Sequence, residues 1–393
     1  MNKTGKKTLL LTKKKFLRFL FIPLALLFFF FSCSQDSLFY DISHEPEPKD
    51  PLIPGSPTNI TLVGNRLYVG TRMGNRIFCY SNVAGNLQWS TISLPTGSLG
   101  ELASDDTYLY ALIFPSGDPI RASAIRRYDV QAGSWDTNYT VSGYSIQSLY
   151  GAGGRIFAGG QYQGNRQNFV LMYLDTALNS LSVIRYGTSL LKGAAIDGRG
   201  TIYLATMGDG IFAFNENTLE TSQVSGTANA NMNGIINVGG SIVAVTGAGE
   251  IYTDSQGSFT NITGGANYTG ALCLWLDPKN QWKPSLLLLG IRGRGSSLSH
   301  GYQEMVLSNG RPTFEIKSTG DGSPTSVKNK AKYSASIGTH PVISILQVPD
   351  SSAGGPLNYL AYSEIPGWEP PIFASTSKDG LWSYRDGEWN AEE

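Results

Sequence analysis

The sequence predicts an all-β fold built from a repeated four-stranded unit, on three observations. From about residue 58 onward the chain is rich in Gly, Tyr, Phe, Val and Ile and poor in charge, which is the composition of strands and turns. Short apolar runs bounded by Gly, Asn and Asp follow one another, with no amphipathic helix pattern longer than three turns. Similar apolar runs also recur at a regular interval.

The recurring runs set the length of the repeat. They are RLYVGT (66–71), YLYALI (108–113), RIFAGG (155–160), TIYLAT (201–206), SIVAVT (241–246), SLLLLG (285–290) and PIFAST (371–376). Their third residues are 42, 47, 46, 40, 44 and 86 positions apart. A period of 40–47 residues with four strands per unit is typical of a β-propeller blade. We therefore predict a seven-bladed β-propeller over residues 58–393, in which stacked blades bury both faces of each sheet.

Each unit holds further segments in a fixed order. An apolar strand precedes the aligned run, as in NGIINVGG (233–240), and another strand follows a turn that contains glycine, as in GDGIFAFN (208–215). A second turn then leads to an aromatic residue, as in AGSW (132–135). Gly208-Asp209-Gly210 is therefore predicted to be a hairpin turn, because a dinucleotide phosphate loop would run into a helix.

The last interval of 86 residues allows two interpretations. In the first, HPVISILQV (340–348) is the inner strand of blade seven, and 349–370 is an extra loop before the next strand of that blade. Blade six is then enlarged, with strands near 302–307 and 312–318. In the second, the interval contains an eighth blade. We favour the first interpretation, so seven blades are expected.

The first 32 residues have the pattern of a secretory signal peptide. Seven basic residues precede the apolar run 19–31, and no acidic residue occurs before Asp36. The run has 13 residues, whereas a membrane-spanning helix needs about 20, and Pro23 interrupts it. We expect residues 1–32 to be removed from the mature protein.

The end of this segment, FFSCSQ, resembles a bacterial lipoprotein signal. In that family cleavage occurs just before the cysteine, which then carries a diacylglycerol and an acylated amine; the resemblance assigns this role to Cys33. Ser32 fits the pattern, while Phe30 and Phe31 depart from the usual leucine and small residue. Two or more acyl chains give stable membrane anchoring. The alternative is an ordinary cleaved signal with an incidental cysteine. Ser34 does not specify inner or outer membrane.

Residues 33–57 are predicted to be a linker between this anchor and the propeller. Five of the 14 residues in 44–57 are proline, which gives an extended, semi-rigid chain. All 30 acidic residues follow Cys33, but seven of the 30 basic ones precede it, which leaves 23 basic residues and a net charge near −7. This balance argues against nucleic acid as a partner.

The residues after position 57 resemble seven-bladed bacterial β-propellers of the WD-repeat, YVTN and Asp-box type. The segment SYRDGEW (383–389) is similar to an Asp-box with one extra residue, and in that family the Asp-box braces a hairpin and carries no catalysis. The chain lacks the Arg-Ile-Pro signature of sialidases and the Gly-x-Ser-x-Gly turn of α/β-hydrolases. We expect no catalytic residues, no metal and no cofactor.

Cysteines and histidines are too few for a metal-binding pattern. Cys79 and Cys273 lie in apolar runs and are expected to be buried thiols. His300 and His340 fall in loops, and no carboxylate stands at ligand spacing from them.

Two segments are expected to contact a partner. GIRGRGSSLSHGYQEM (290–305) combines arginines, a histidine and a tyrosine among glycines, and 351–370 is a long loop rich in aromatic residues. The predicted contact residues are Arg292, Arg294, His300, Tyr302, Tyr359, Tyr362 and Trp368.

The sequence as a whole indicates a lipid-anchored protein of the bacterial cell envelope. Its propeller is expected to act as a non-enzymatic binding or scaffold module for an unidentified envelope or surface protein. The alternative is a propeller enzyme or small-ligand binder of the lyase, lactonase or quinone-dependent dehydrogenase type, which requires Asp, His or Arg clustered at the mouth of the channel. A purely structural envelope protein is a third interpretation.

Overall fold

The computed structural model describes residues 53, 56–64, 66–72, 76–83, 86–115, 123–165, 167–255, 258–263, 266–277, 283–292, 301–318, 337, 341–347, 372–377, 380–385 and 388–392. Residues 1–50 and 51–393 form two separate units. The predicted signal peptide, Cys33 and most of the predicted linker lie outside the described residues. No helix among the described residues is long and apolar enough to cross a membrane.

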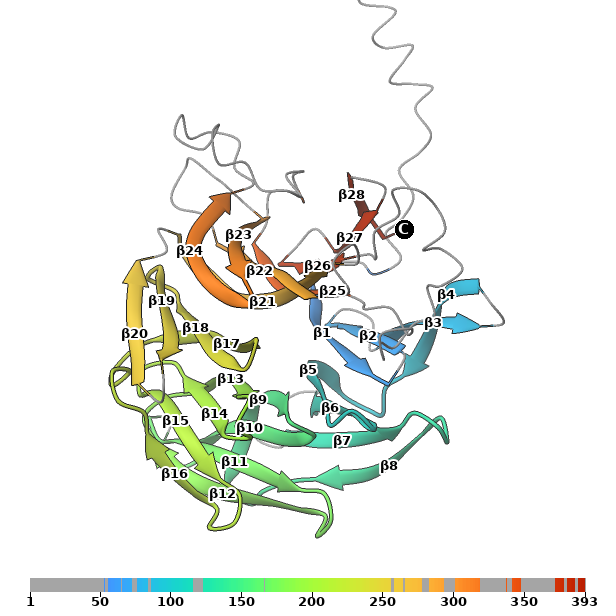
Figure 1. Ribbon diagram of the computed structural model, residues 1–393. Coiled ribbons are helices and arrows are strands. Elements are labelled where there is room, and N and C mark those ends of the chain that lie inside the picture. The colour runs from blue at the N-terminus through green and yellow to red at the C-terminus, as the bar shows by residue number, and fades with distance from the viewer. Residues whose placement is uncertain are drawn as a thin grey trace, which may run out of the picture. The chain divides into compact units, whose positions relative to one another are not determined.

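Seven antiparallel sheets, each made of four consecutive strands, make up the described part of the second unit (Figure 1). Blades 1 to 4 are β1–β4 (Pro57–Val63, Arg66–Thr71, Arg76–Val83, Asn86–Ser93), β5–β8 (Ser98–Ser104, Tyr108–Phe114, Ala124–Asp129, Ser134–Tyr139), β9–β12 (Tyr144–Ala152, Arg155–Tyr162, Phe169–Asp175, Ser180–Gly187) and β13–β16 (Leu191–Ile196, Ile202–Thr206, Gly210–Asn215, Glu220–Gln223). Blades 5 to 7 are β17–β20 (Met232–Val238, Ser241–Thr246, Glu250–Ser255, Ser258–Thr263), β21–β24 (Tyr268–Asp277, Lys283–Ile291, Gly301–Ser308, Arg311–Ser318) and β25–β28 (Val342–Gln347, Ile372–Thr376, Leu381–Arg385, Glu388–Ala391).

These sheets confirm the predicted all-β, seven-bladed β-propeller. The runs that recur in the sequence are the second strands of the seven blades. Blade 6 contains the two strands expected near 302–307 and 312–318, and β25 is the inner strand expected for blade 7. The proposed extra loop, 349–370, lies outside the described residues.

The seven inner strands are arranged in a closed ring. Each of β1, β5, β9, β13, β17, β21 and β25 contacts the next, and β25 contacts β1. In Figure 1 the red strands of blade 7 accordingly lie beside the blue strands of blade 1. We call the face on which the inner strands begin the start face, and the opposite face the end face. Because neighbouring strands are antiparallel, the second strand of each blade ends on the start face.

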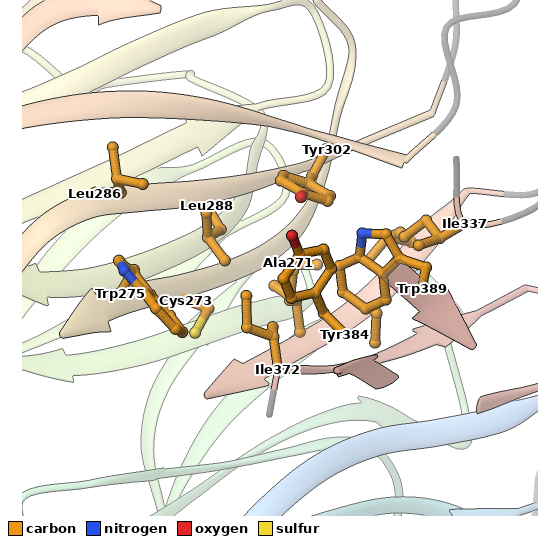
Figure 2. Packing of buried hydrophobic residues seen from close by; sticks show 13 residues of the cluster. Ala271, Cys273, Trp275, Leu286, Leu288, Tyr302, Ile337, Ile372, Tyr384 and Trp389 are labelled. Carbon is orange, nitrogen blue, oxygen red and sulfur yellow. The ribbon is translucent and has the colours of Figure 1, made fainter. Parts of the chain in front are cut away.

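The core is divided among the blade boundaries. The described residues form seven hydrophobic clusters, and each cluster combines side chains of two adjacent blades. Figure 2 shows the cluster between blades 6 and 7, where Trp275 and Tyr302 of blade 6 and Trp389 of blade 7 are buried. This arrangement confirms that stacked sheets bury each other's faces, and it places most of the apolar surface between blades rather than in one central core.

Both described cysteines are buried free thiols, as expected. Cys79 lies in the cluster between blades 1 and 2, and Cys273 in the cluster between blades 6 and 7. The Cys273 sulfur accepts a hydrogen bond from the Gln347 amide at 3.1 Å, and burial raises the pKa of its thiol to about 12. It is therefore uncharged and unreactive near neutral pH.

Side chains on the inner strands tie neighbouring blades together through the backbone. Asn59 of blade 1 accepts a hydrogen bond from the Leu102 amide of blade 2 at 2.7 Å and donates to the carbonyl of the same residue. Gln347 of blade 7 pairs in the same way with Leu276 of blade 6, at 2.7 and 2.9 Å. Such bonds satisfy backbone groups of the inner strands and connect adjacent blades.

Ring closure does not use a shared strand, because blade 1 is formed entirely by the beginning of the unit and blade 7 entirely by its end. Side chains join the two blades instead. Ile53, which precedes β1, is completely buried in the cluster between blades 7 and 1. The Ile60 amide donates to the Ser344 hydroxyl at 3.0 Å, and the Trp89 ring nitrogen donates to Glu392 at 2.9 Å. The last residues of the predicted linker are thus part of the folded unit.

The segment Gly208-Asp209-Gly210 belongs to a hairpin turn, as predicted: residues 207–209 connect β14 to β15, and Gly210 is the first residue of β15, paired with Thr206. Gly208 and Gly210 have φ of 133° and 82°. The Asp209 carboxylate accepts hydrogen bonds from the amide and the hydroxyl of Thr188, at 3.0 and 2.7 Å, across the boundary between blades 3 and 4. The aspartate therefore braces two blades.

Candidate functional site

The structure describes two of the residues expected to contact a partner. Arg292 follows β22 directly, is exposed, and donates its amide hydrogen to the Asn267 carbonyl at 2.7 Å. Tyr302 is the second residue of β23 and is completely buried, 5.7 Å from the Trp389 ring (Figure 2). It is a core residue and offers no surface to a partner. Cys33, Arg294, His300, Tyr359, Tyr362 and Trp368 lie outside the described residues.

The two predicted contact segments are attached to opposite faces of the ring. β22 ends at Ile291, which pairs with Tyr268 at the beginning of an inner strand, so this end of β22 lies on the start face. β25 is itself an inner strand, so Gln347 at its end lies on the end face. The two segments therefore leave the described part of the propeller on different faces.

A channel with a volume of about 610 Å³ runs between the inner strands. Side chains from all seven blades line it, one or more from each. They include Arg72, Glu101, Tyr150, Lys192, Asn233, Arg292 and Ile343, in the order of blades 1 to 7. A volume of about 300–1,000 Å³ is the usual range for small-molecule sites.

Positive charge dominates the channel near the start face. Arg72 follows the end of β2, Arg292 follows the end of β22, and Lys192 is the second residue of β13. Among the described residues, none of these three side chains makes an ion pair or a hydrogen bond. Glu101 is the single carboxylate in the described lining. The channel mouth therefore carries an excess of uncompensated positive charge.

Glu101 is held by the neighbouring blade. Its carboxylate accepts a hydrogen bond from the Leu149 amide of blade 3 at 2.8 Å. Burial raises the pKa of this carboxyl group above its usual value, while the Leu149 amide, Lys192 and Arg72 oppose the rise. The Glu101 side chain is half-buried in the channel wall. Glu101 thus helps to join blades 2 and 3 and gives only partial compensation for the cations.

The side chains of Asn59 and Tyr150 separate the channel from a second space in the ring. A second space of about 180 Å³ lies toward the end face, lined by Ser104, Asp106 and the 151–154 turn among others. Asn59 and Tyr150 line both spaces and therefore lie between them. Burial, together with the charge of Glu101, raises the pKa of Tyr150 well above its usual value. The tyrosine stays protonated at physiological pH.

Tyr144, Tyr162 and Tyr186 form a second feature of the start face, which we call the tyrosine patch. The rings of Tyr144 and Tyr162 are 5.5 Å apart, and the neighbouring Tyr186 hydroxyl raises the pKa of Tyr144 above its usual value. Tyr162 is 42% exposed and Tyr186 is 71% exposed. Across the blade boundary, Met207 follows β14 and is 52% exposed.

The sequence predicted one residue of these features, Arg292, as a partner contact, and none of the others. Their residues come from different strands, so no continuous motif marks them. A signal was nevertheless present, because Lys192, Asn233 and Ile343 each occupy the second position of an inner strand. An alignment of the repeats on their first strands, rather than on their second strands, would have placed these three channel residues at the same position. In the described ranges, no group of three His, Cys, Asp or Glu side chains is placed to hold a metal ion.

Comparisons with known proteins identify the fold alone. No protein-family model and no curated protein matches the chain. Among solved structures, PorZ of Porphyromonas gingivalis, described as an essential bacterial surface component of the type-IX secretion system, is similar with a TM-score of 0.52 and 12% identity. The match covers 88% of this chain and 39% of PorZ, so the chain spans about two fifths of PorZ. At this identity, the likeness shows a shared fold.

Proposed function

We propose that this protein is a lipid-anchored protein of the bacterial cell envelope, and that its propeller binds another envelope or surface protein through the start face. The tyrosine patch is the observation that carries the proposal. Exposed tyrosines are enriched at protein interfaces because they bring a large apolar ring and a hydrogen-bonding hydroxyl at low entropic cost. A rigid sheet edge that presents three adjacent tyrosines suits a binding module.

The backbone around the patch supports this role. The Tyr162 amide donates to the Asn168 carbonyl at 2.9 Å, and the Gln163 amide donates to the Gly143 carbonyl at 2.9 Å. These bonds hold the turn after β10 against the start of β9. Because these bonds hold the backbone at Tyr162 before binding, a partner would not have to order this turn, which lowers the cost of association.

An envelope location has two supports. The first is the N-terminal pattern that ends at Cys33. The second is the likeness in fold to PorZ, which is described as a bacterial surface component. Both are consistent with a propeller held at a membrane by a lipid and a proline-rich linker.

Substituting Cys33→Ala should release the protein from the membrane fraction. The acyl chains on this residue would supply the membrane affinity, and the alanine variant has no thiol to accept them. Cell fractionation followed by immunoblotting measures the distribution. Ser34→Ala is the matched control and should remain with the membrane. Retention of Cys33→Ala in the membrane fraction would refute the lipid anchor.

Substituting both Tyr162→Ser and Tyr186→Ser should weaken partner capture about tenfold or more, since truncation of central interface tyrosines commonly costs 2 kcal/mol or more. Chemical crosslinking in intact cells, followed by purification of the protein, measures the yield. Leu178→Ser is the matched control, because Leu178 is 75% exposed in the β11–β12 turn on the end face. Equal capture by the double variant and the wild type would remove the tyrosine patch from the proposal.

A further inference from the structure

We propose that the central channel binds a small multivalent anion, with carboxylate or phosphate groups, between Arg72, Lys192 and Arg292. This site is separate from the tyrosine patch and does not depend on partner binding. None of the three side chains makes an ion pair or a hydrogen bond with the described residues, and the one nearby carboxylate, Glu101, interacts electrostatically with Lys192 and Arg72 without balancing all three charges.

The charge of the mouth contrasts with the charge of the chain. From Cys33 onward the sequence has 23 basic and 30 acidic residues, yet the described channel lining has three cations and one carboxylate. Like charges that share a confined space with limited water repel one another. A bound anion removes this repulsion, and a cleft of one sign concentrates ligands of the opposite sign.

The positions of the cations indicate more than one anionic group on the ligand. Arg72, Lys192 and Arg292 come from blades 1, 4 and 6, so they approach the channel from different sides of the ring. A ligand with two or three anionic groups can contact several of them at once, and the volume of about 610 Å³ admits a small organic molecule. Arginine also pairs with carboxylate and phosphate groups through two parallel hydrogen bonds.

The other residues that line the channel determine how a ligand would be oriented in it. Glu101 is the fourth residue of its inner strand, whereas Lys192 is the second, so the carboxylate lies farther from the start face; its charge favours anionic groups at the mouth. Asn233 of blade 5, like Lys192, is the second residue of an inner strand; its amide nitrogen donates one hydrogen to the Tyr268 carbonyl at 2.8 Å, which leaves the second N–H for a ligand. Ile343 of blade 7 is 39% exposed and provides an apolar contact. The site therefore suits a compact anion with a short hydrocarbon part.

Isothermal titration of the full-length purified protein tests this proposal, with citrate and pyrophosphate as separate probes at constant ionic strength. We expect at least one probe to bind, and the double variant Lys192→Gln with Arg292→Gln to weaken that binding about tenfold or more. Binding of citrate alone assigns a polycarboxylate ligand, and binding of pyrophosphate alone assigns a phosphorylated one. The absence of binding by both probes overturns the proposal.

Two further variants separate a specific site from general attraction. Arg311→Gln removes one exposed positive charge at the β23–β24 turn on the end face, and it should change the affinity less than twofold. Glu101→Gln keeps an oxygen to accept the Leu149 amide and removes the repelling charge, so it should tighten binding several-fold. Because we expect Glu101→Gln to increase the affinity for the probe, it tests the proposal even if the double variant fails to fold. If Arg311→Gln lowered the affinity for the probe as much as the double variant does, the proposed site would be contradicted. An unchanged affinity in Glu101→Gln would contradict it as well.

Discussion

Replacing Ile53 by alanine is expected to lower the free energy of unfolding by about 2–5 kcal/mol, the usual cost of truncating a buried isoleucine. Ile53 is completely buried, although it precedes the first strand. It packs with Leu67 and Phe78 of blade 1 and with Phe373 and Leu381 of blade 7. Because no strand is shared between these blades, loss of this side chain weakens the closure of the ring directly.

Denaturant unfolding followed by tryptophan fluorescence measures this change, and Trp89 reports from the same boundary, where its ring centroid lies 6.0 Å from that of Phe373. Leu178→Ala, on an exposed turn, is the matched control and should change stability by less than about 0.5 kcal/mol. If Ile53→Ala were as stable as this control, the segment before β1 would have no part in closing the ring.

Replacing Gly210 by alanine is expected to destabilise the protein by about 2–5 kcal/mol, through two separate effects. Gly210 has φ of 82°, where an L-residue costs about 1–2 kcal/mol. Its new Cβ would also overlap the Thr227 carbonyl oxygen, which belongs to the backbone and cannot rotate away. Overpacking of this kind typically costs about 1–3 kcal/mol more.

Gly200→Ala isolates the first effect. Gly200 has φ of 87°, but no atom lies within 4 Å of the position that a Cβ would occupy. We expect a loss of about 1–2 kcal/mol for this variant. The difference between the two variants, measured by denaturant unfolding, gives the cost of the close approach to Thr227. Equal losses would show that the turn relaxes and that Gly210 is required only for its φ.

The architecture was predictable because a propeller repeats one local unit. Each blade is formed by consecutive strands, so the apolar run and the turn glycines of a blade lie within 40–47 residues of sequence. TIYLAT and GDGIFAFN became β14 and β15, joined by the expected turn. The contribution of Ile53 was not predictable, because the preceding prolines indicate an extended linker while its packing depends on blade 7, more than 300 residues later.

The candidate site was less predictable because ring closure, rather than local sequence, assembles it. Arg72, Lys192 and Arg292 are more than 90 residues apart and meet only around the channel. Arg292 was selected from its glycine-rich surroundings, whereas Arg72 directly follows a strand and Lys192 lies within one, and neither position has a distinguishing motif. Tyr302 was expected to contact a partner because it lies near two arginines and a histidine in a glycine-rich segment, but it packs against blade 7 and is buried. Which face of a strand is covered depends on the neighbouring blade.

Site-specific photo-crosslinking in intact cells tests the central claim, that a partner protein binds the start face, most directly. A photoreactive benzoylphenylalanine would replace Tyr186 on the start face in one strain and Leu178 on the end face in another. Both positions are exposed and lie on β12 or in the turn that precedes it, so the probes differ mainly in the face that they sample. We predict a discrete crosslinked protein from position 186 and none from position 178. A discrete product from 178 alone, or the same product from both positions, would contradict binding at the start face.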